Sequence, residues 1–205
     1  MRYAFLHKSF QEFFSGFYLA CQILDGGNDC VSVVNDKRFK DELKQVFLFM
    51  IGILASTSKE TAESVIKIMA ENINLVDSDC DKDRGLFHLA LGCILECTSL
   101  SRTLGLHLHI SNLDLSGVII HGSGAAALSK VLSANSSVTS LSLAANRIRD
   151  SGATSLSQAL ATNSSLTSLD LYDNGIGASG ATSLSQALAV NSSLTSLNLS
   201  ESRCL

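Results

Sequence analysis

Leucine and other apolar residues recur along the second half of the chain with a period of 28 residues. The segments Asn135–Thr162 and Asn163–Val190 are two copies of one unit, and 20 of their 28 positions are identical. A third copy begins at Asn191, and a weaker one precedes Asn135. A fixed period in this range is typical of stacked supersecondary units, each of which buries its apolar face against its neighbours.

Each unit begins with the alternating pattern L-x-x-L-x-L-x-x-N-x-I, which is complete at Leu166–Ile176. Leu169 and Leu171 alternate there with polar residues, which predicts a short strand with one buried face. Asn146 or Asn174 follows the strand, and a buried asparagine at this place is predicted to bond the backbone of the turn. The strands should be parallel, and one leucine of each should stack in a buried ladder. The ladder leucines are Leu113, Leu141, Leu169 and Leu197.

The second half of each unit has apolar residues at helical spacing. Ala181, Leu184 and Leu188 show this spacing in the segment Ser179–Ala189. Ser179 is a candidate N-cap, because a serine side chain can accept a hydrogen bond from the first turn of a helix.

Strand, turn and helix within 28 residues resemble the leucine-rich repeat, and the full helix in each unit resembles its ribonuclease-inhibitor-like type. The resemblance implies an α/β leucine-rich-repeat solenoid with parallel strands and one helix per repeat. It assigns residues 101–205 to three repeats and a truncated fourth. Val118 and Ser202 depart from the pattern, because each stands where the repeat has its asparagine.

Residues 1–100 carry helical patterns instead, which predicts an all-α helical segment before the repeats. Gly26 can end the first helix, and Ser58 can cap a later one. Val46–Ala55 is an unbroken apolar run that is too short to span a bilayer and is typical of a buried core helix. Ser99–Leu106 is the predicted junction with the repeats. The predicted helices are Arg2–Leu24, Phe39–Ser56, Lys59–Asn72 and Arg84–Thr98.

The first predicted helix carries a broad apolar stripe from Phe5 to Leu19, and the phrase F-L-H-K-S-F-Q-E-F-F spans Phe5–Phe14. This phrase resembles the end of the winged-helix region in NOD-like receptors, which combine a NACHT nucleotide-binding module with leucine-rich repeats. The helices after it resemble the second helical domain of those receptors. The resemblance implies a non-catalytic autoregulatory or ligand-sensing segment of a cytosolic innate immune receptor, with the NACHT module expected upstream.

A generic leucine-rich-repeat scaffold is the alternative. It would bind another protein, such as a regulator or an inhibitor, and would have no immune role. The repeats fit both hypotheses, whereas the phrase at Phe5–Phe14 has a reason to exist only in the first. Because the sequence begins within that phrase's helix and stops within a repeat, a fragment of a larger protein is expected.

The net charge and the cysteines indicate which classes of partner and which cellular compartment fit the protein. The net charge of −4 argues against nucleic acid or an anionic membrane as a partner. The six cysteines form no C-x-x-C pair, which is typical of free thiols in a reducing compartment such as the cytoplasm. Cys93 and Cys97 lie one helical turn apart in an apolar run and are expected to be buried. With only His88 as a further ligand nearby, no zinc site or other cofactor is predicted.

Several motifs resemble catalytic or binding signatures but fail on closer comparison. G-x-G-x-x-A at Gly122–Ala127 has its second glycine at a position that recurs in the following repeats, so it is interpreted as the turn of the repeat. Asp77–Gly85 lacks the glycine and glutamate of an EF-hand and is interpreted as a solvated acidic turn that caps a helix. His107 and His109 lack a third ligand and are placed on an exposed strand edge of the first repeat. No phosphate loop occurs, so the protein is not expected to be an enzyme or to hydrolyse ATP.

The open face of the predicted strands is the candidate binding surface for a protein partner or ligand. Of the eight positions that differ between the two best copies, six lie on this face or in the turn after it. Most side chains on the face are small and polar, so Tyr172 is the strongest anchor. The candidate binding residues are Asp114, Ser142, Ser168, Asp170, Tyr172, Asp173 and Asn198.

Two further expectations concern the unit boundaries. Asn135, Asn163 and Asn191 each open an N-x-S sequon, and we interpret these sequons as by-products of the repeat.

The last segment, Asn191–Leu205, is expected to be the least ordered part of the repeats and to mediate self-association. The reason is that a final strand without a cap leaves apolar side chains and backbone groups uncovered.

Overall fold

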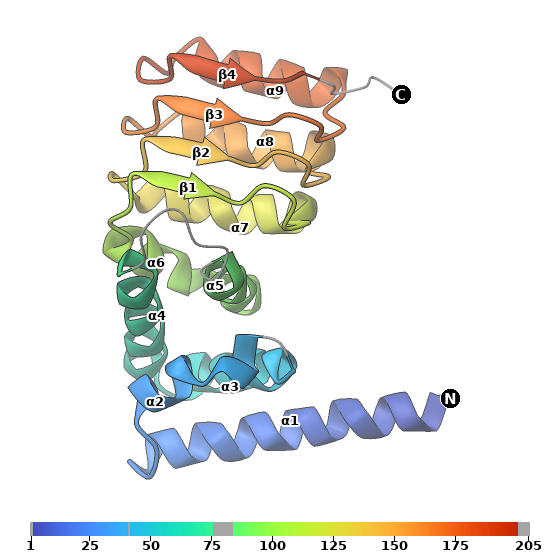
Figure 1. The fold of residues 1–205 in the computed structure, drawn as a ribbon, viewed down its shortest axis with the longest axis vertical. Coiled ribbons are helices and arrows are strands. Elements are labelled where there is room, and N and C mark those ends of the chain that lie inside the picture. The colour runs from blue at the N-terminus through green and yellow to red at the C-terminus, as the bar shows by residue number, and fades with distance from the viewer. Residues whose placement is uncertain (1, 41, 76–83, 201–205) are drawn as a thin grey trace.

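The computed structural model describes residues 2–40, 42–75 and 84–200, which form an elongated stack of helices followed by repeats (Figure 1). The N-terminal part contains the helices α1 (Arg2–Leu24), α2 (Cys30–Asn35), α3 (Lys44–Thr57), α4 (Lys59–Asn74), α5 (Arg84–Glu96) and α6 (Ser101–His107). Short 3₁₀ turns lie at Lys37–Lys40 and Thr98–Leu100. The repeats contain β1 (Asn112–Asp114), α7 (His121–Ala134), β2 (Ser140–Ser142), α8 (Arg149–Leu160), β3 (Ser168–Asp170), α9 (Ala178–Leu188) and β4 (Ser196–Asn198).

The four strands form one parallel sheet in chain order, β1-β2-β3-β4. Leu113 pairs with Leu141, Leu141 with Leu169, and Leu169 with Leu197. The predicted ladder and its register are therefore confirmed. Each strand is only three residues long, so the described chain is mostly helical and the sheet is a narrow ribbon in front of α7, α8 and α9 (Figure 1).

The helices behind the sheet pack closely because a glycine recurs near the start of each. At Gly152 in α8, an added Cβ would lie 2.4 Å from Cγ2 of Ile148 and 3.0 Å from Cβ of Ala125 in α7. Any larger side chain would therefore push α7 and α8 apart. This spacing is what lets units of one length stack without a gap.

The predicted N-cap at Ser179 is wrong. The helix α9 already begins at Ala178, with Gly177 at the N-cap position and no side-chain cap of its own. Asp150 of the preceding repeat takes this role, since its Oδ1 accepts the N–H of Gly177 at 2.6 Å and the N–H of Gly180 at 3.1 Å. A carboxylate suits the positive end of the helix dipole. One repeat thus caps the helix of the next.

The core of the helical part is built on α3, whose apolar run is buried as predicted. Val46, Phe47, Met50, Ile51 and Leu54 are all buried. The predicted helix Phe39–Ser56 is wrong at its start, because a separate 3₁₀ turn precedes α3. No helix among the described residues is long and apolar enough to cross a membrane.

Two helix ends follow the predicted signals, and one helix was missed. The hydroxyl of Ser58 accepts the N–H of Thr61 at 3.4 Å and caps α4 as expected. Gly26 ends α1 with a φ of 72°, in the left-handed region that glycine adopts without strain. The short helix α2 was not predicted, although Asp29 caps it by accepting the N–H of Val31.

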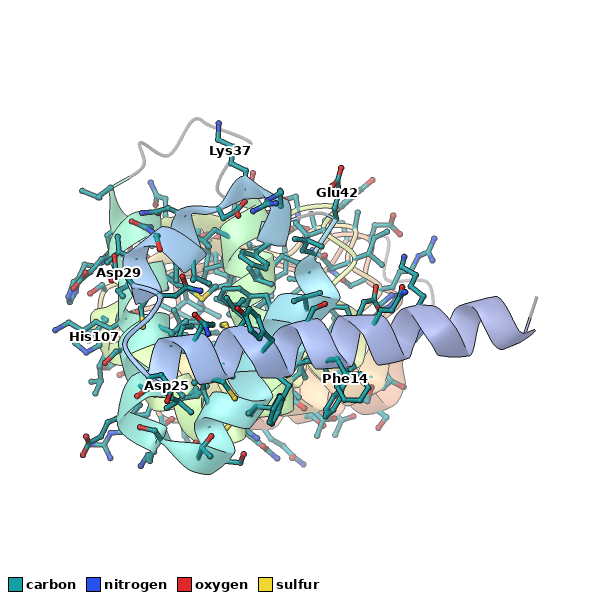
Figure 2. The ribbon with its side chains drawn as sticks, turned by 90° about the horizontal axis from the view of Figure 1, so that it is seen from below. Phe14, Asp25, Asp29, Lys37, Glu42 and His107 are labelled. Atoms are coloured by element: carbon teal, nitrogen blue, oxygen red, sulfur yellow. The ribbon has the colours of Figure 1, made fainter. Side chains whose placement is uncertain are left out.

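The last turns of α1 pack on α3, but much of its apolar stripe is not covered within the described residues. Gly16 allows the close contact, since an added Cβ there would lie 2.8 Å from Cβ of Phe49. The rings of Phe13, Phe14 and Phe17 are exposed. Figure 2 shows α1 lying across this end of the molecule, with the Phe14 ring beside the middle part of the helix.

The predicted junction Ser99–Leu106 is mainly the helix α6, which packs against α7 and joins the two parts without an extended linker. The Asn74 side chain donates to the carbonyl of His107 and accepts the N–H of His109, both at 2.7 Å. The placement of these histidines on a strand edge is wrong, because His107 ends α6 and β1 begins only at Asn112. Most of the acidic segment Asp77–Gly85 lies outside the described residues.

Candidate protein-binding face

One face of the sheet is turned away from α7, α8 and α9 and is covered by no other element of the described chain (Figure 1). Alternation along each strand puts the ladder leucines toward the helices and the flanking polar residues on this open face. The open-face residues are exposed or half-buried. They are Asn112, Ser140, Ser168 and Ser196 at the strand starts, and Asp114, Ser142, Asp170 and Asn198 at the strand ends.

The acidic and amide side chains at the strand ends fix the backbone that follows them. Oδ1 of Asp170 accepts the N–H of Tyr172 at 2.9 Å, and Oδ1 of Asn198 accepts that of Ser200 at 3.0 Å. Asp114 does the same for the N–H of its second neighbour, also at 2.9 Å. These bonds are Asx turns, so the side chains at this edge are ordered before any partner arrives.

Tyr172 is the largest side chain on the open face and is 37% exposed. Its backbone is held on both sides, because its N–H bonds Asp170 and its carbonyl accepts the N–H of Ala145 at 2.9 Å. Asp173 follows it in the turn, exposed and with a φ of 50°. A tyrosine whose backbone is fixed and which lies between two carboxylates in the sequence is a suitable anchor for a protein partner, because a tyrosine ring adds a large contact area with few rotatable bonds.

Asn146 and Asn174 lie behind the face and are fully buried. Nδ2 of Asn174 donates to the carbonyls of Leu143 at 2.8 Å and Tyr172 at 3.1 Å. Its Oδ1 accepts the N–H of Asn146 at 3.1 Å and of Ile148 at 3.2 Å. Each asparagine thus joins two neighbouring turns, which holds the open-face residues in register.

A second ladder of asparagines was missed as a structural feature. Nδ2 of Asn163 donates to the carbonyls of Leu132 at 2.8 Å and Asn135 at 2.9 Å, while Oδ1 accepts the N–H of Leu166 at 2.8 Å. Asn135 and Asn191 make the equivalent bonds. Nδ2 of each donates to a carbonyl that precedes its own unit, and Oδ1 of each accepts an N–H three residues later. The amide nitrogen of the sequon is therefore engaged in the fold. The recurrence of asparagine at the first position of three successive units, Asn135, Asn163 and Asn191, was the signal that could have revealed this role.

The variable residues between the two best copies do not all belong to the open face. Arg147 lies exposed in the turn that leads into α8, with a φ of 55°, and Arg149 is the exposed first residue of α8, with a φ of 57°. Asp150 is committed to the backbone of the next repeat. On the open face itself, the largest change between the two copies is therefore Tyr172, which stands where the preceding copy has Ala144.

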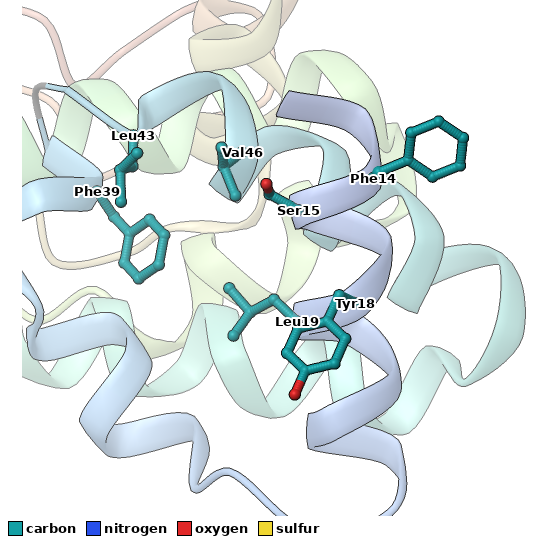
Figure 3. A pocket seen from close by; sticks show the side chains of 7 residues that line it. All are labelled: Phe14, Ser15, Tyr18, Leu19, Phe39, Leu43 and Val46. Atoms are coloured by element: carbon teal, nitrogen blue, oxygen red, sulfur yellow. The ribbon is translucent and has the colours of Figure 1, made fainter. Parts of the chain in front are cut away.

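A hollow of about 450 Å³ lies between α1 and α3 and was not predicted (Figure 3). Leu19 of α1 and Phe39 of the 3₁₀ turn line it, while the rings of Phe14 and Tyr18 at its rim are strongly exposed. Figure 3 shows the Phe14 ring pointing away from the hollow. The lining residues are Phe14, Ser15, Tyr18, Leu19, Phe39, Leu43 and Val46.

Lys44 and His88 form a partly buried pair of titratable groups in the helical part. Nζ of Lys44 lies 2.8 Å from Nδ1 of His88. Partial burial lowers the pKa of Lys44, and the pKa of His88 is lowered by burial and by the charge of Lys44. Cys93 is buried as expected, but Cys97 is only half-buried, and neither forms a disulfide. In residues 2–40, 42–75 and 84–200, no three histidine, cysteine or acidic side chains are grouped to hold a metal ion.

A family described as Leucine Rich repeat matches residues 134–157 and 162–185, which lie on the two best copies of the unit. No curated protein matches the chain. Among solved structures, the chain is similar to one titled Leiomodin-1 Actin-Binding Site 2 (ABS2), with 24% sequence identity and a TM-score of 0.43. The match covers 48% of this chain and 57% of that structure. The family match and the parallel ladder of β1–β4 support leucine-rich repeats in the second half of the chain, where strands and helices form an α/β solenoid after a helical segment.

Proposed function

We propose that the chain is a non-catalytic scaffold that binds a protein partner on the open face of β1–β4. The observation that carries this proposal is the ordered edge around Tyr172, where an Asx turn and a buried asparagine fix the backbone that presents the exposed side chain. A preorganised backbone loses little entropy on association, so more of the contact energy is kept. No catalytic group is required for this role.

The chemistry of the face sets the strength of binding. Serines dominate it, and such residues contribute little to interfaces, whereas a tyrosine near the centre can dominate the affinity. Asp170 and Asp173 beside Tyr172 add negative charge. A partner with a donor or cation next to an apolar contact fits this arrangement, because complementary charge raises specificity and association rate.

Photo-cross-linking tests this site. A benzophenone amino acid is placed at position 172 and, as a matched control, at Gln186, which is exposed on α9 away from the sheet. Cross-linked proteins from cells that express each variant are identified by mass spectrometry. A partner captured at 172 and absent at 186 supports the open face, and equal capture at both positions contradicts it.

We further propose that the chain is a cytoplasmic segment of a NOD-like receptor, in which residues 101–205 sense a ligand or maintain the inactive state and residues 1–100 connect them to a NACHT module. The phrase at Phe5–Phe14 and the order of helices before repeats support this proposal. The free thiols of Cys21, Cys30, Cys93 and Cys97 are compatible with a reducing compartment.

A generic scaffold without an immune role is the second candidate. It is favoured by the family match, which lies within the repeats and covers none of the helical part. The transcript sequence 5′ of the codon for Met1 separates the two. A G-x-x-x-x-G-K-[ST] phosphate loop in frame supports the receptor. An in-frame upstream region without one, or a stop codon, supports the generic scaffold.

A further inference from the structure

The segments that lead from β1 into α7 and from β2 into α8 hold four exposed residues in the left-handed backbone region. They are Ile119 and His121 in the first repeat and Arg147 and Arg149 in the second, with φ values from 55° to 62°. His121 and Arg149 are also the first residues of their helices. We call these four residues the turn edge.

The backbone of the turn edge is one that glycine adopts more easily than these residues do. In the left-handed region a Cβ crowds the following carbonyl oxygen, and a β-branched residue such as Ile119 is seldom found there. The third repeat has Gly175 and Gly177 where the second has Arg147 and Arg149, and Gly175 keeps the left-handed backbone with a φ of 63°. The fold therefore accepts glycine at these positions, and the first two repeats hold larger side chains there against a backbone cost. Such outliers are typical of binding sites.

Hydrogen bonds between repeats hold the two turns side by side. The N–H of His121 donates to the carbonyl of Asn146 at 3.0 Å, which places His121 next to Arg147 of the following repeat. The N–H of Arg149 donates to the carbonyl of Asn174 at 3.0 Å in the same way. Both turns are therefore fixed by the repeat that follows them, and the turn edge is presented in one arrangement before a ligand arrives.

The charges around the turn edge select an anion. Neither Arg147 nor Arg149 forms an ion pair with a residue that the structure describes. The carboxylate of Asp150 is occupied, because its Oδ1 accepts two backbone N–H groups at the start of α9. Asp173 is exposed in the turn of the third repeat and repels a second anion. An acidic ligand therefore fits the first two turns and not the third.

We propose that the turn edge docks an acidic segment of a protein partner, with carboxylates on Arg147 and Arg149 and an apolar side chain against Ile119. A guanidinium group donates paired N–H bonds that match the geometry of a carboxylate. The ring of His121 adds a donor beside them. Ile119 is 48% exposed, and a small inorganic anion would leave this apolar side chain unused. The turn edge does not include Tyr172, so this docking surface goes beyond the function proposed above.

An NMR titration of the full chain with the peptide Glu-Glu-Leu-Glu-Glu tests the proposal, and Gln-Gln-Leu-Gln-Gln is the neutral probe. The variant Arg147→Gly/Arg149→Gly copies the residues of the third repeat, so it is expected to fold. Arg147→Gln/Arg149→Gln removes the same charges without adding glycine. Arg102→Gln/Lys130→Gln is the matched control, because it changes the net charge equally at exposed positions on α6 and α7. Thermal melting of each variant measures its stability.

The acidic peptide is expected to shift the amide signals of His121, Arg147 and Arg149 and to bind at least about 5-fold more tightly than the neutral peptide, a modest factor because exposed ion pairs are weak. Both variants of Arg147 and Arg149 should lose this factor, and the control should keep it. The glycine variant should melt no lower than the glutamine variant, because glycine relieves the left-handed backbone.

Three results overturn the proposal. The first is a wild type that binds both peptides equally, or neither of them up to about 10 mM. The second is a variant of Arg147 and Arg149 that binds the acidic peptide like the wild type, or a control that loses as much affinity as those variants. The third is a glycine variant that melts below the glutamine variant, since the turns would then not be strained.

Discussion

Replacing Asn174 by alanine should unfold the turn between the last two complete repeats. The side chain makes four hydrogen bonds, two donated and two accepted, and is 1% exposed. Each bond contributes about 0.5–1.5 kcal/mol net, which gives a loss of about 2–6 kcal/mol for the set. Water can enter the space left by the side chain, so a value near the middle of this range is expected.

Asn198→Ala is the control, because the same atoms are removed from a half-buried side chain for which one bond, from the Ser200 N–H, is found in the described chain. It should cost no more than about 1 kcal/mol. Urea titrations of both variants give the comparison, and hydrogen exchange at the amides of Asn146 and Ile148 gives a local readout that does not depend on two-state unfolding. A loss at Asn174 no larger than that at Asn198 would refute the reasoning that the buried asparagines hold the repeats together.

Three further changes test other parts of the fold. Leu169→Ala should cost about 2–5 kcal/mol in urea titration, since the side chain is 2% exposed, and a loss typical of surface residues would mean that the ladder is misplaced. Asp150→Ala should cost about 0.5–2 kcal/mol by removing the cap of α9, while Asp150→Asn keeps an acceptor and should cost less; equal losses would contradict the cap. The lowered pKa of His88 means that the unfolded chain takes up a proton more readily than the folded chain, so the melting temperature should fall as pH drops below about 6.5, and His88→Gln should reduce this fall. An unchanged pH dependence in His88→Gln would show that other groups cause it.

The repeats were largely predictable because the same signals recur at one spacing. A single strand of three residues gives little evidence by itself, but four copies at 28 residues fix both the strand and its register. Leucine at the ladder positions and asparagine at the turn were each confirmed for this reason. Repetition makes a weak local signal strong.

The features that sequence reasoning missed depend on contacts between repeats. Ser179 fits a capping position locally, yet the cap comes from Asp150, whose carboxylate reaches the next unit. Asn163 opens an N-x-S sequon in the sequence, whereas its burial follows from the stacking of its repeat on the preceding one. The residue pattern within a single unit cannot predict the Asp150 cap or the Asn163 hydrogen bonds, because both join neighbouring units.

In the helical part, the sequence predicted most of the helices but not which of their faces are covered. The apolar residues of α1 predicted a helix with a broad apolar stripe, but periodicity alone does not say whether another element covers them. Phe14 and Tyr18 are exposed at the rim of the hollow, while Leu19 and Phe39 line it. The hollow arises from the angle between two helices, which the spacing of apolar residues does not determine.

The central claim is that a protein partner binds the open face through Tyr172. Calorimetric titration of the partner captured by cross-linking tests it most directly, with Tyr172→Ala compared against Gln186→Ala on the outer side of α9. The account predicts that Tyr172→Ala raises the dissociation constant at least about 30-fold, as expected for a binding hot spot, while Gln186→Ala leaves it unchanged. Equal affinity of Tyr172→Ala and the wild type, with both folded, would contradict the account.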